Sequence, residues 1–232
     1  GNGKIVGDGP DGVANPAPEA KTLVWEDVAA DGTELSGTTS YDAGGINVDI
    51  DYNPQDHGAT ATISDEEMYV ETGEGFDGDS SLALYGKGGE GGWDDTSTTT
   101  LNFSSTSAAF EDEVQNVAFR INDVDLATQL LDTHVDRVTI NAFDADGNPV
   151  DVQITSETGD QIIDDNQATG DIDDKSHDRV TPASEEGSIL VSIAGPVSSL
   201  SIDYDNEKFT GNLLDFLVRA EKDPNVPQKS EK

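Results

Sequence analysis

The chain has 232 residues, with 48 Asp and Glu against 12 Lys and Arg, a formal net charge of −36, and no cysteine. The lack of thiols excludes disulfides, thiolate metal sites and a cysteine nucleophile. The excess of acid argues against a nucleic-acid or anionic-membrane partner, because both are bound through basic patches, and it suits salt water or a place rich in divalent cations.

The two ends of the chain differ from its middle. Residues 1–20 are rich in Gly, Pro, Asp and Ala and are interpreted as a flexible linker; residues 222–232 are interpreted as a second one. Residues 21–221 are expected to form a single module. No run reaches the roughly 18 apolar residues of a membrane helix, so no membrane insertion is expected. We interpret the chain as a monomeric module of a larger extracellular protein, either secreted or on the cell surface.

Short runs of alternating apolar and polar residues follow one another through this module. Alternation with period two places one set of side chains on a buried sheet face and the other toward water. The expected strands are residues 21–26, 46–52, 67–71, 81–85, 98–103, 117–121, 138–142, 150–154, 189–193, 200–204 and 213–219. With no convincing amphipathic helix, they predict an all-β fold: one β-sandwich or jelly roll of two antiparallel sheets with long acidic loops.

Four segments between these runs have other expected structures. Residues 126–131 are helix-like, for one or two turns. Residues 86–95 are rich in glycine, and residues 161–178 in aspartate; both are interpreted as surface loops. Residues 143–150 carry Asp-Gly at their centre, which predicts a hairpin turn. The alternative there is a calcium loop, but the glutamate expected at its twelfth position is Thr155.

Three short motifs resemble the calcium-binding jelly-roll carbohydrate-binding modules. They are Trp-Glu-Asp at 25–27, Gly-Asp-Ser-Ser-Leu-Ala-Leu at 78–84 and Leu-Asp-Phe at 214–216. The resemblance implies one Ca²⁺ site, with Glu26 or Asp27, Asp79 and Asp215 as ligands. Asp215 has a further argument, since a carboxylate within an apolar run is costly unless it is paired or bound to metal. The alternative is an outward-facing position on an edge strand.

The second half of the chain is similar to modules of giant surface and repeat-in-toxin-type proteins of marine bacteria. Residues 117–125, 137–150 and 193–197 carry this similarity. Such modules are usually passive or adhesive, which implies an extracellular, non-catalytic role. The histidines His57, His134 and His177 lie far apart in sequence and outside any zinc motif, and we interpret them as surface residues.

Aromatic side chains are the candidates for sugar binding, because a pyranose face stacks on a ring. Trp93 ends the glycine-rich loop and is the main candidate, although it could instead fold back over the core. Tyr41, Tyr52 and Tyr85 are further candidates, whereas Trp25 lies within an expected strand and is assigned to the core.

These features favour a calcium-stabilised, non-catalytic binding module with a polysaccharide or cell-surface glycan as its partner. One alternative is a structural or adhesive spacer in which calcium only adds rigidity. Another is a polysaccharide-active enzyme, since 48 acidic residues allow many carboxylate pairs.

Overall fold

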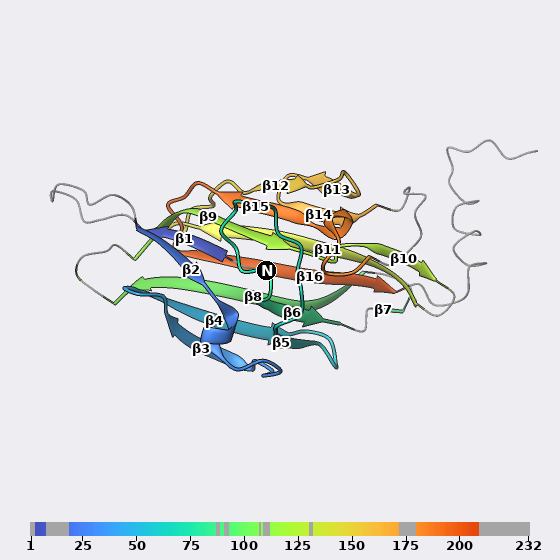
Figure 1. The fold of residues 1–232 in the computed structure, drawn as a ribbon, viewed down its shortest axis with the longest axis horizontal. Helices are drawn as coiled ribbons and strands as arrows, with labels where there is room; N and C mark the ends of the chain where they lie inside the picture. Colours follow the sequence, from blue (N-terminus) through green and yellow to red (C-terminus); the bar gives the residue numbers. More distant parts are fainter. Residues whose placement is uncertain are drawn as a thin grey trace, which may run out of the picture.

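The computed structural model describes residues 3–7, 19–86, 89–90, 93–106, 108, 112–129, 132–171 and 180–208. Two large sheets face each other across a common core, with a small third sheet beside them (Figure 1). This confirms the predicted all-β sandwich, and the ladders are antiparallel apart from one two-residue parallel pairing. Jelly-roll connectivity stays a prediction. The expected strand 213–219 and linker 222–232 lie outside the described residues.

The strands divide among three sheets. The first sheet has the order β12 (Gln153–Ser156), β15 (Ile189–Ile193), β9 (Val114–Ile121), β1 (Gly3–Gly7) and β2 (Glu19–Leu23). The second sheet has the order β13 (Gln161–Asp164), β14 (Gln167–Gly170), β11 (Asp132–Phe143), β16 (Ser199–Lys208), β8 (Asp94–Ser105), β4 (Ile46–Pro54) and β3 (Gly37–Asp42). On its margin, β10 (Leu126–Gln129) pairs with β11, and β7 (Gly89–Glu90) with β16. The small sheet joins β5 (Thr60–Ser64) to β6 (Ser81–Tyr85).

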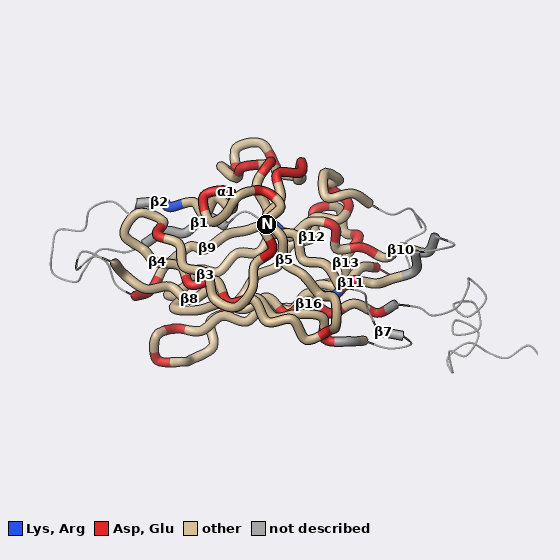
Figure 2. The backbone as a smooth tube through the Cα atoms, turned by 90° about the horizontal axis from the view of Figure 1, so that it is seen from below, with Lys and Arg blue, Asp and Glu red and all other residues tan. Residues whose placement is uncertain are grey.

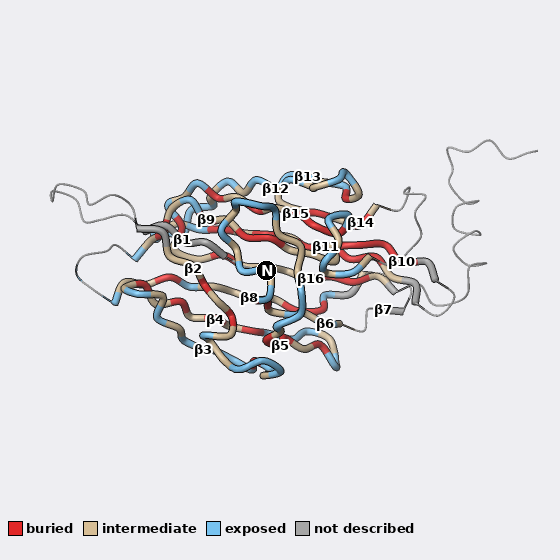
Figure 3. The backbone as a smooth tube through the Cα atoms, in the orientation of Figure 1, coloured by how far each residue is buried: buried red, intermediate tan, exposed pale blue. Residues whose placement is uncertain are grey.

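The core is built by the alternation that the sequence displays. In β4 the side chains at Ile46, Val48, Ile50 and Tyr52 are all buried, while the residues between them are only partly buried. The inward residues of β9, β11, β15 and β16 belong to the same apolar cluster. Buried stretches therefore run along both sheets, and exposed ones along the connections (Figure 3).

The N-terminal residues contradict the interpretation of 1–20 as linker alone. β1 lies between β2 and β9 and pairs with both: Gly3 is opposite Leu23 on one side and Phe119 on the other. Five residues bounded by glycines are too short to display a period, so the strand is defined by backbone pairing on two sides rather than by its side chains.

Two further segments differ from their expected structure because pairing outweighs composition. Residues 126–129 form β10 instead of a helical turn, since they pair with β11 in a hairpin. Residues 161–170 form the β13–β14 hairpin rather than a loop, and β14 continues the second sheet beside β11. Of the remainder of that expected loop, residues 172–178 lie outside the described residues.

The connection between β5 and β6 is irregular, although residues 67–71 are expected to form a strand. The Met68 N–H donates to the Gly78 carbonyl at 2.7 Å, and the Tyr69 N–H to the Pro182 carbonyl at 2.9 Å. These isolated bonds satisfy the backbone without a ladder, so the apparent alternation builds no strand. β3 and β5 are strands that the sequence analysis missed.

Asp144 is a turn residue, as the hairpin interpretation predicts. Its Oδ1 accepts hydrogen bonds from the N–H groups of Asn148 at 2.8 Å and Asp146 at 3.0 Å. The Asn148 bond is the largest cause of a lowered pKa at Asp144, and Gly147 supplies the positive φ of the turn, +81°.

Two short helices interrupt the strands in the described part of the chain. α1 (Trp25–Val28) replaces the end of the strand expected at 21–26, and η1 (Glu185–Gly187) is a 3₁₀ turn before β15. Neither of these described helices is long enough to cross a membrane. Acidic residues are spread along the loops and along several of the strands (Figure 2).

Candidate metal centre

Asp125 is positioned by an irregular stretch, residues 122–125, immediately before β10. The Val124 N–H donates to the Gly187 carbonyl at 3.0 Å. The Val124 carbonyl in turn accepts from Gln161 Nε2 at 2.9 Å. The stretch is therefore fixed on both sides although it forms no ladder, which gives Asp125 a defined place.

His134 and Asp136 lie two residues apart on β11 and project from the same face. The Asp136 N–H donates to the Asp125 carbonyl at 2.9 Å, which brings Asp125 beside that face. His134 Nε2 lies 3.0 Å from Asp125 Oδ1 and 3.6 Å from Asp136 Oδ2. One candidate ligand atom from each residue lies within 4.8 Å of the other two. These three residues, here the Asp–His–Asp cluster, could hold a metal ion.

The second oxygen of each carboxylate is held by donors from neighbouring elements. Tyr204 Oη and Asn206 Nδ2, both on β16, donate to Asp136 Oδ1 at 2.6 and 2.7 Å. The Val180 N–H donates to Asp125 Oδ2 at 3.2 Å. Such outer hydrogen bonds orient ligand carboxylates in metal sites. Each carboxylate therefore presents its other oxygen to the imidazole.

Two buried carboxylates lie close together in the cluster. Each carboxylate side chain is 7% exposed and the imidazole is 18% exposed. Burial, opposed by His134 and the Tyr204 hydrogen bond and reinforced by Asp125, raises the pKa of Asp136 to about 7. Both carboxylates can stay ionised only if a positive charge lies between them. A metal ion or a protonated His134 would supply it.

The donor set fits a transition metal better than calcium. Zn²⁺ binds imidazole nitrogen and carboxylate oxygen in four-coordinate sites, and three protein ligands leave one position open. Ca²⁺ takes about six to eight oxygen ligands and gains little from a nitrogen. His134 is the ligand that favours a transition metal over calcium, because it offers a nitrogen atom.

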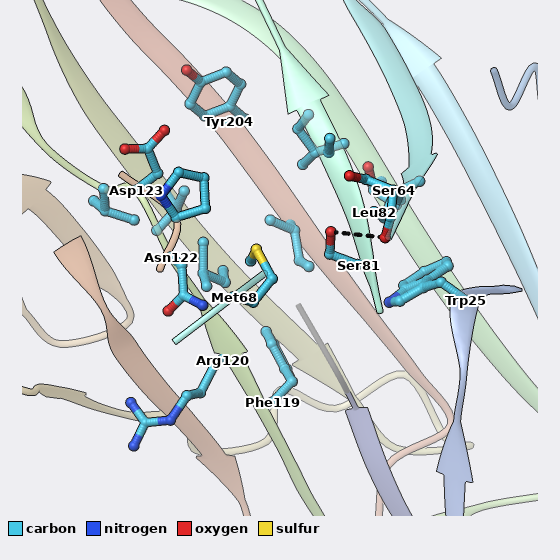
Figure 4. Close-up of a pocket in the computed structure, with 18 of the residues that line it drawn as sticks. Trp25, Ser64, Met68, Ser81, Leu82, Phe119, Arg120, Asn122, Asp123 and Tyr204 are labelled. Atoms are coloured by element: carbon cyan, nitrogen blue, oxygen red, sulfur yellow. Dashed lines mark hydrogen bonds between the residues drawn. The ribbon is translucent and has the colours of Figure 1, made fainter. Parts of the chain in front are cut away.

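A cavity of about 480 Å³ lies between the sheets and reaches the cluster. Figure 4 shows Met68, Leu82 and Phe119 along its apolar wall, with Tyr204 at one side. His134 and Asp136 line the cavity, but Asp125 does not. Tyr85, which is 58% exposed, also lines it, so the cavity reaches the molecular surface there.

The calcium ligands implied by resemblance lie elsewhere. The Trp25 N–H donates to Ser80 Oγ at 2.8 Å, so the first two motifs are neighbours in space. Asp27 Oδ2 accepts from Tyr41 Oη at 3.4 Å. Within the described residues, Glu26, Asp27 and Asp79 belong to no group of three or more candidate ligands. Asp215 lies outside the described residues, so this site stays a prediction.

The aromatic candidates have separate environments. Tyr52 is 4% exposed on the inner face of β4, so its ring cannot stack on a surface ligand, and Trp25 is 5% exposed in the core. Trp93 is partly exposed, and the Arg137 guanidinium carbon lies 4.2 Å from its ring centre. Tyr85 lies at the cavity and Tyr41 beside Asp27.

None of the three members of the cluster was predicted as a metal ligand in the sequence analysis. His134 is interpreted there as a surface residue, yet it lies on β11 and is largely buried. A signal was present: Asp136 is in phase with the buried residues Val138 and Ile140, so it faces the core. An acid in a core-facing position needs a partner.

The comparisons with known proteins give no relative. No protein-family model matches the chain, and neither the curated proteins nor the solved structures include a similar one. The two resemblances of the sequence therefore stay predictions, and function has to be inferred from geometry.

Proposed function

We propose that the chain is a non-catalytic binding module whose fold is stabilised by a divalent metal ion at the Asp–His–Asp cluster. The observation that carries the proposal is the convergence of two buried carboxylates on one imidazole nitrogen, at 3.0 and 3.6 Å. An ion there would tie the irregular stretch 122–125 to β11. Because the outer oxygens are bonded to β16 and to the Val180 N–H, the ion would also stabilise those contacts.

Zinc, or a transition metal of similar preference, is the proposed occupant. The imidazole argues for it, and calcium would have to be bound mainly by the two carboxylates. Calcium remains the proposed ion for the separate site implied by Glu26, Asp27, Asp79 and Asp215. The overall acidity is consistent with an extracellular place rich in divalent cations.

Thermal unfolding with different ions tests this proposal. A ligand that binds only the folded state stabilises it by about 2.7 kcal/mol at a hundredfold excess over Kd. We therefore expect Zn²⁺ to raise Tm by several degrees above Ca²⁺ or Mg²⁺ at matched ionic strength. His134→Gln should remove the zinc-specific shift, and Asp144→Asn, a turn residue, should retain it. Equal shifts with all three ions, or a full shift in His134→Gln, would contradict the assignment.

A glycan is the proposed partner of the module, with Trp93 as the contact. The support is a partly exposed indole whose neighbour Arg137 is fixed by two hydrogen bonds to Asp205 Oδ2, at 2.9 and 3.0 Å. A ring beside an oriented donor suits a sugar, which stacks and hydrogen-bonds at once. Glycan-array binding with and without chelator separates a binding module from a spacer, which would bind nothing in either state.

A further inference from the structure

The cavity between the sheets has a largely apolar wall, and part of its polar lining belongs to the Asp–His–Asp cluster and its hydrogen-bond partners. Apolar side chains from both sheets and the small sheet contribute to the wall, including Phe119, Leu101 and Leu84. His134, Asp136, Tyr204 and Asn206 line the cavity together, and the other three all contact the Asp136 carboxylate. A volume of about 480 Å³ lies in the range of pockets that bind small organic ligands.

The metal centre and the cavity share two residues. His134 and Asp136 contribute both to the cluster and to the cavity wall, whereas Asp125 approaches from outside the cavity. An ion with three protein ligands keeps one position open. With Asp125 on the far side, the cavity is the side from which a fourth ligand would reach the ion.

An anionic head group would depend on the metal ion for a positive charge, because of the other charged side chains that line the cavity. Arg120 lines the cavity, but its guanidinium bonds Glu74 at 2.5 and 2.7 Å and lies 3.0 Å from Glu157. Figure 4 shows it directed away from the apolar side chains. Its charge is therefore already matched by protein carboxylates. The remaining acids of the wall, Glu66 and Asp123, repel an anion.

We propose that the cavity binds a long-chain carboxylate, with the alkyl chain along the apolar wall and the carboxylate on the metal ion at the Asp–His–Asp cluster. This inference rests on the proposed metal site. The alkyl chain is removed from water by contact with Phe119 and its neighbours. The carboxylate head group completes the coordination of the ion. Tyr85, at the surface end of the cavity, marks the point of entry.

A fluorescent binding assay on the full chain tests the proposal. Dansyl-labelled undecanoic acid is titrated into zinc-loaded protein and into chelator-treated protein, and is then displaced with palmitic acid, hexadecanol or hexadecylamine. We expect at least tenfold tighter dye binding to the zinc-loaded protein, and displacement by palmitic acid at much lower concentration than by the other two. Zinc binding itself is measured separately by calorimetry.

Two tryptophan variants distinguish the cavity from the surface. Leu84→Trp adds bulk to the cavity wall and should weaken dye binding at least tenfold while calorimetric zinc binding is retained. Ile162→Trp, on an exposed position of β13, is the matched control and should bind dye as the parent does. Circular dichroism and Tm verify that both variants fold.

The outcomes separate this inference from the metal site. If zinc does not bind, the proposed function itself fails. If zinc binds but the dye does not, the cavity is closed or filled by the chain itself, and the carboxylate proposal is overturned. Equal displacement by palmitic acid and hexadecylamine, or equal loss of dye binding in both tryptophan variants, would overturn it as well.

Discussion

Among the described residues, a buried charge cluster on one large sheet can be compared with a buried charge cluster on the other. On β9 the Arg120 guanidinium, 1% exposed, meets Glu74, Glu157 and Ser188 Oγ, and stacks 5.1 Å from the Tyr69 ring centre. On β11 the Asp–His–Asp cluster holds two carboxylates against one imidazole. The first cluster contains a permanent cation, because arginine stays protonated, whereas the second depends on a titratable histidine or an added ion. Similar burial thus gives one network that contains its own cation and one cluster whose positive charge has to come from His134 or from an added ion.

Breaking the first cluster should have the largest effect on stability. Arg120→Ala leaves Glu74 and Glu157 without their cation in a mostly buried place, and removing one partner of such a network costs about 3–5 kcal/mol. Urea unfolding measures the loss. Arg137→Ala is the control: its side chain is 25% exposed, and it leaves one carboxylate, Asp205, without its cation instead of two, so it should lose less. Similar losses in the two variants would mean that burial of the Arg120 network matters little.

Changing the second cluster should give opposite results with and without metal. Asp136→Asn keeps the side-chain shape but removes one of the two negative charges. The metal-free variant should be as stable as the parent or more so, whereas the gain of about 2.7 kcal/mol at a hundredfold excess of zinc over Kd should be lost. Urea unfolding with zinc and with chelator measures both. A large loss of stability in the metal-free variant would contradict this comparison.

The two clusters should also differ in their pH dependence. Burial raises the pKa of Glu74, but the Arg120 hydrogen bonds outweigh it and leave the pKa below its ordinary value. The unfolded state then binds the proton more tightly, so this contribution is present above the ordinary pKa of glutamate and is lost as pH falls through the lowered one. In metal-free protein the raised pKa of Asp136 gives the opposite pH dependence of stability. The folded state binds the proton more tightly than the unfolded state, so stability falls as pH rises from about 4 toward 7.

Two variants distinguish these two pH dependences when the free energy of unfolding in urea is measured over a range of pH. Glu74→Gln should flatten the dependence in the acid range, and Asp136→Asn the dependence between about pH 4 and 7. Zinc should remove this fall in stability in the parent protein, because zinc binding requires deprotonated ligands and therefore strengthens as pH rises. If Asp136→Asn changes only the acid range, the assignment of the two slopes is wrong.

The smallest stability effect is expected at Trp93. The indole is partly exposed and packs on Arg137, a contact worth about 0.5–1 kcal/mol at such sites. Trp93→Ala should therefore change Tm little while removing retention on a polysaccharide column. Tyr85→Ala, at an aromatic residue that is 58% exposed, should keep that retention. A drop in Tm typical of a core tryptophan would move the binding surface elsewhere.

The parts of the fold that could be predicted from the sequence are the strands in which apolar and polar side chains alternate. β4, β9, β11, β15 and β16 were found because their inward positions are apolar. β1, β10, β13 and β14 were not, because their pairing partners rather than their own patterns define them.

The Asp–His–Asp cluster could not be predicted from the sequence for a related reason. The in-phase position of Asp136 marks an acid that faces the core, and this much could be read from the sequence. Its meeting with Asp125 depends on the fixed stretch 122–125 and on the register of β10 against β11, which places Ala127 opposite His134. Neither follows from residue type or spacing.

The position of β1 has a consequence for how this chain can be shortened or assembled. Because β1 pairs with β2 on one side and with β9 on the other, removing residues 3–7 would split the first sheet internally instead of trimming a tail. The gap would expose two unpaired backbone edges that face each other, a template for a strand from another molecule. A shortened chain would thus be prone to strand exchange between copies, and a peptide of the sequence Gly-Lys-Ile-Val-Gly would compete for the vacant place.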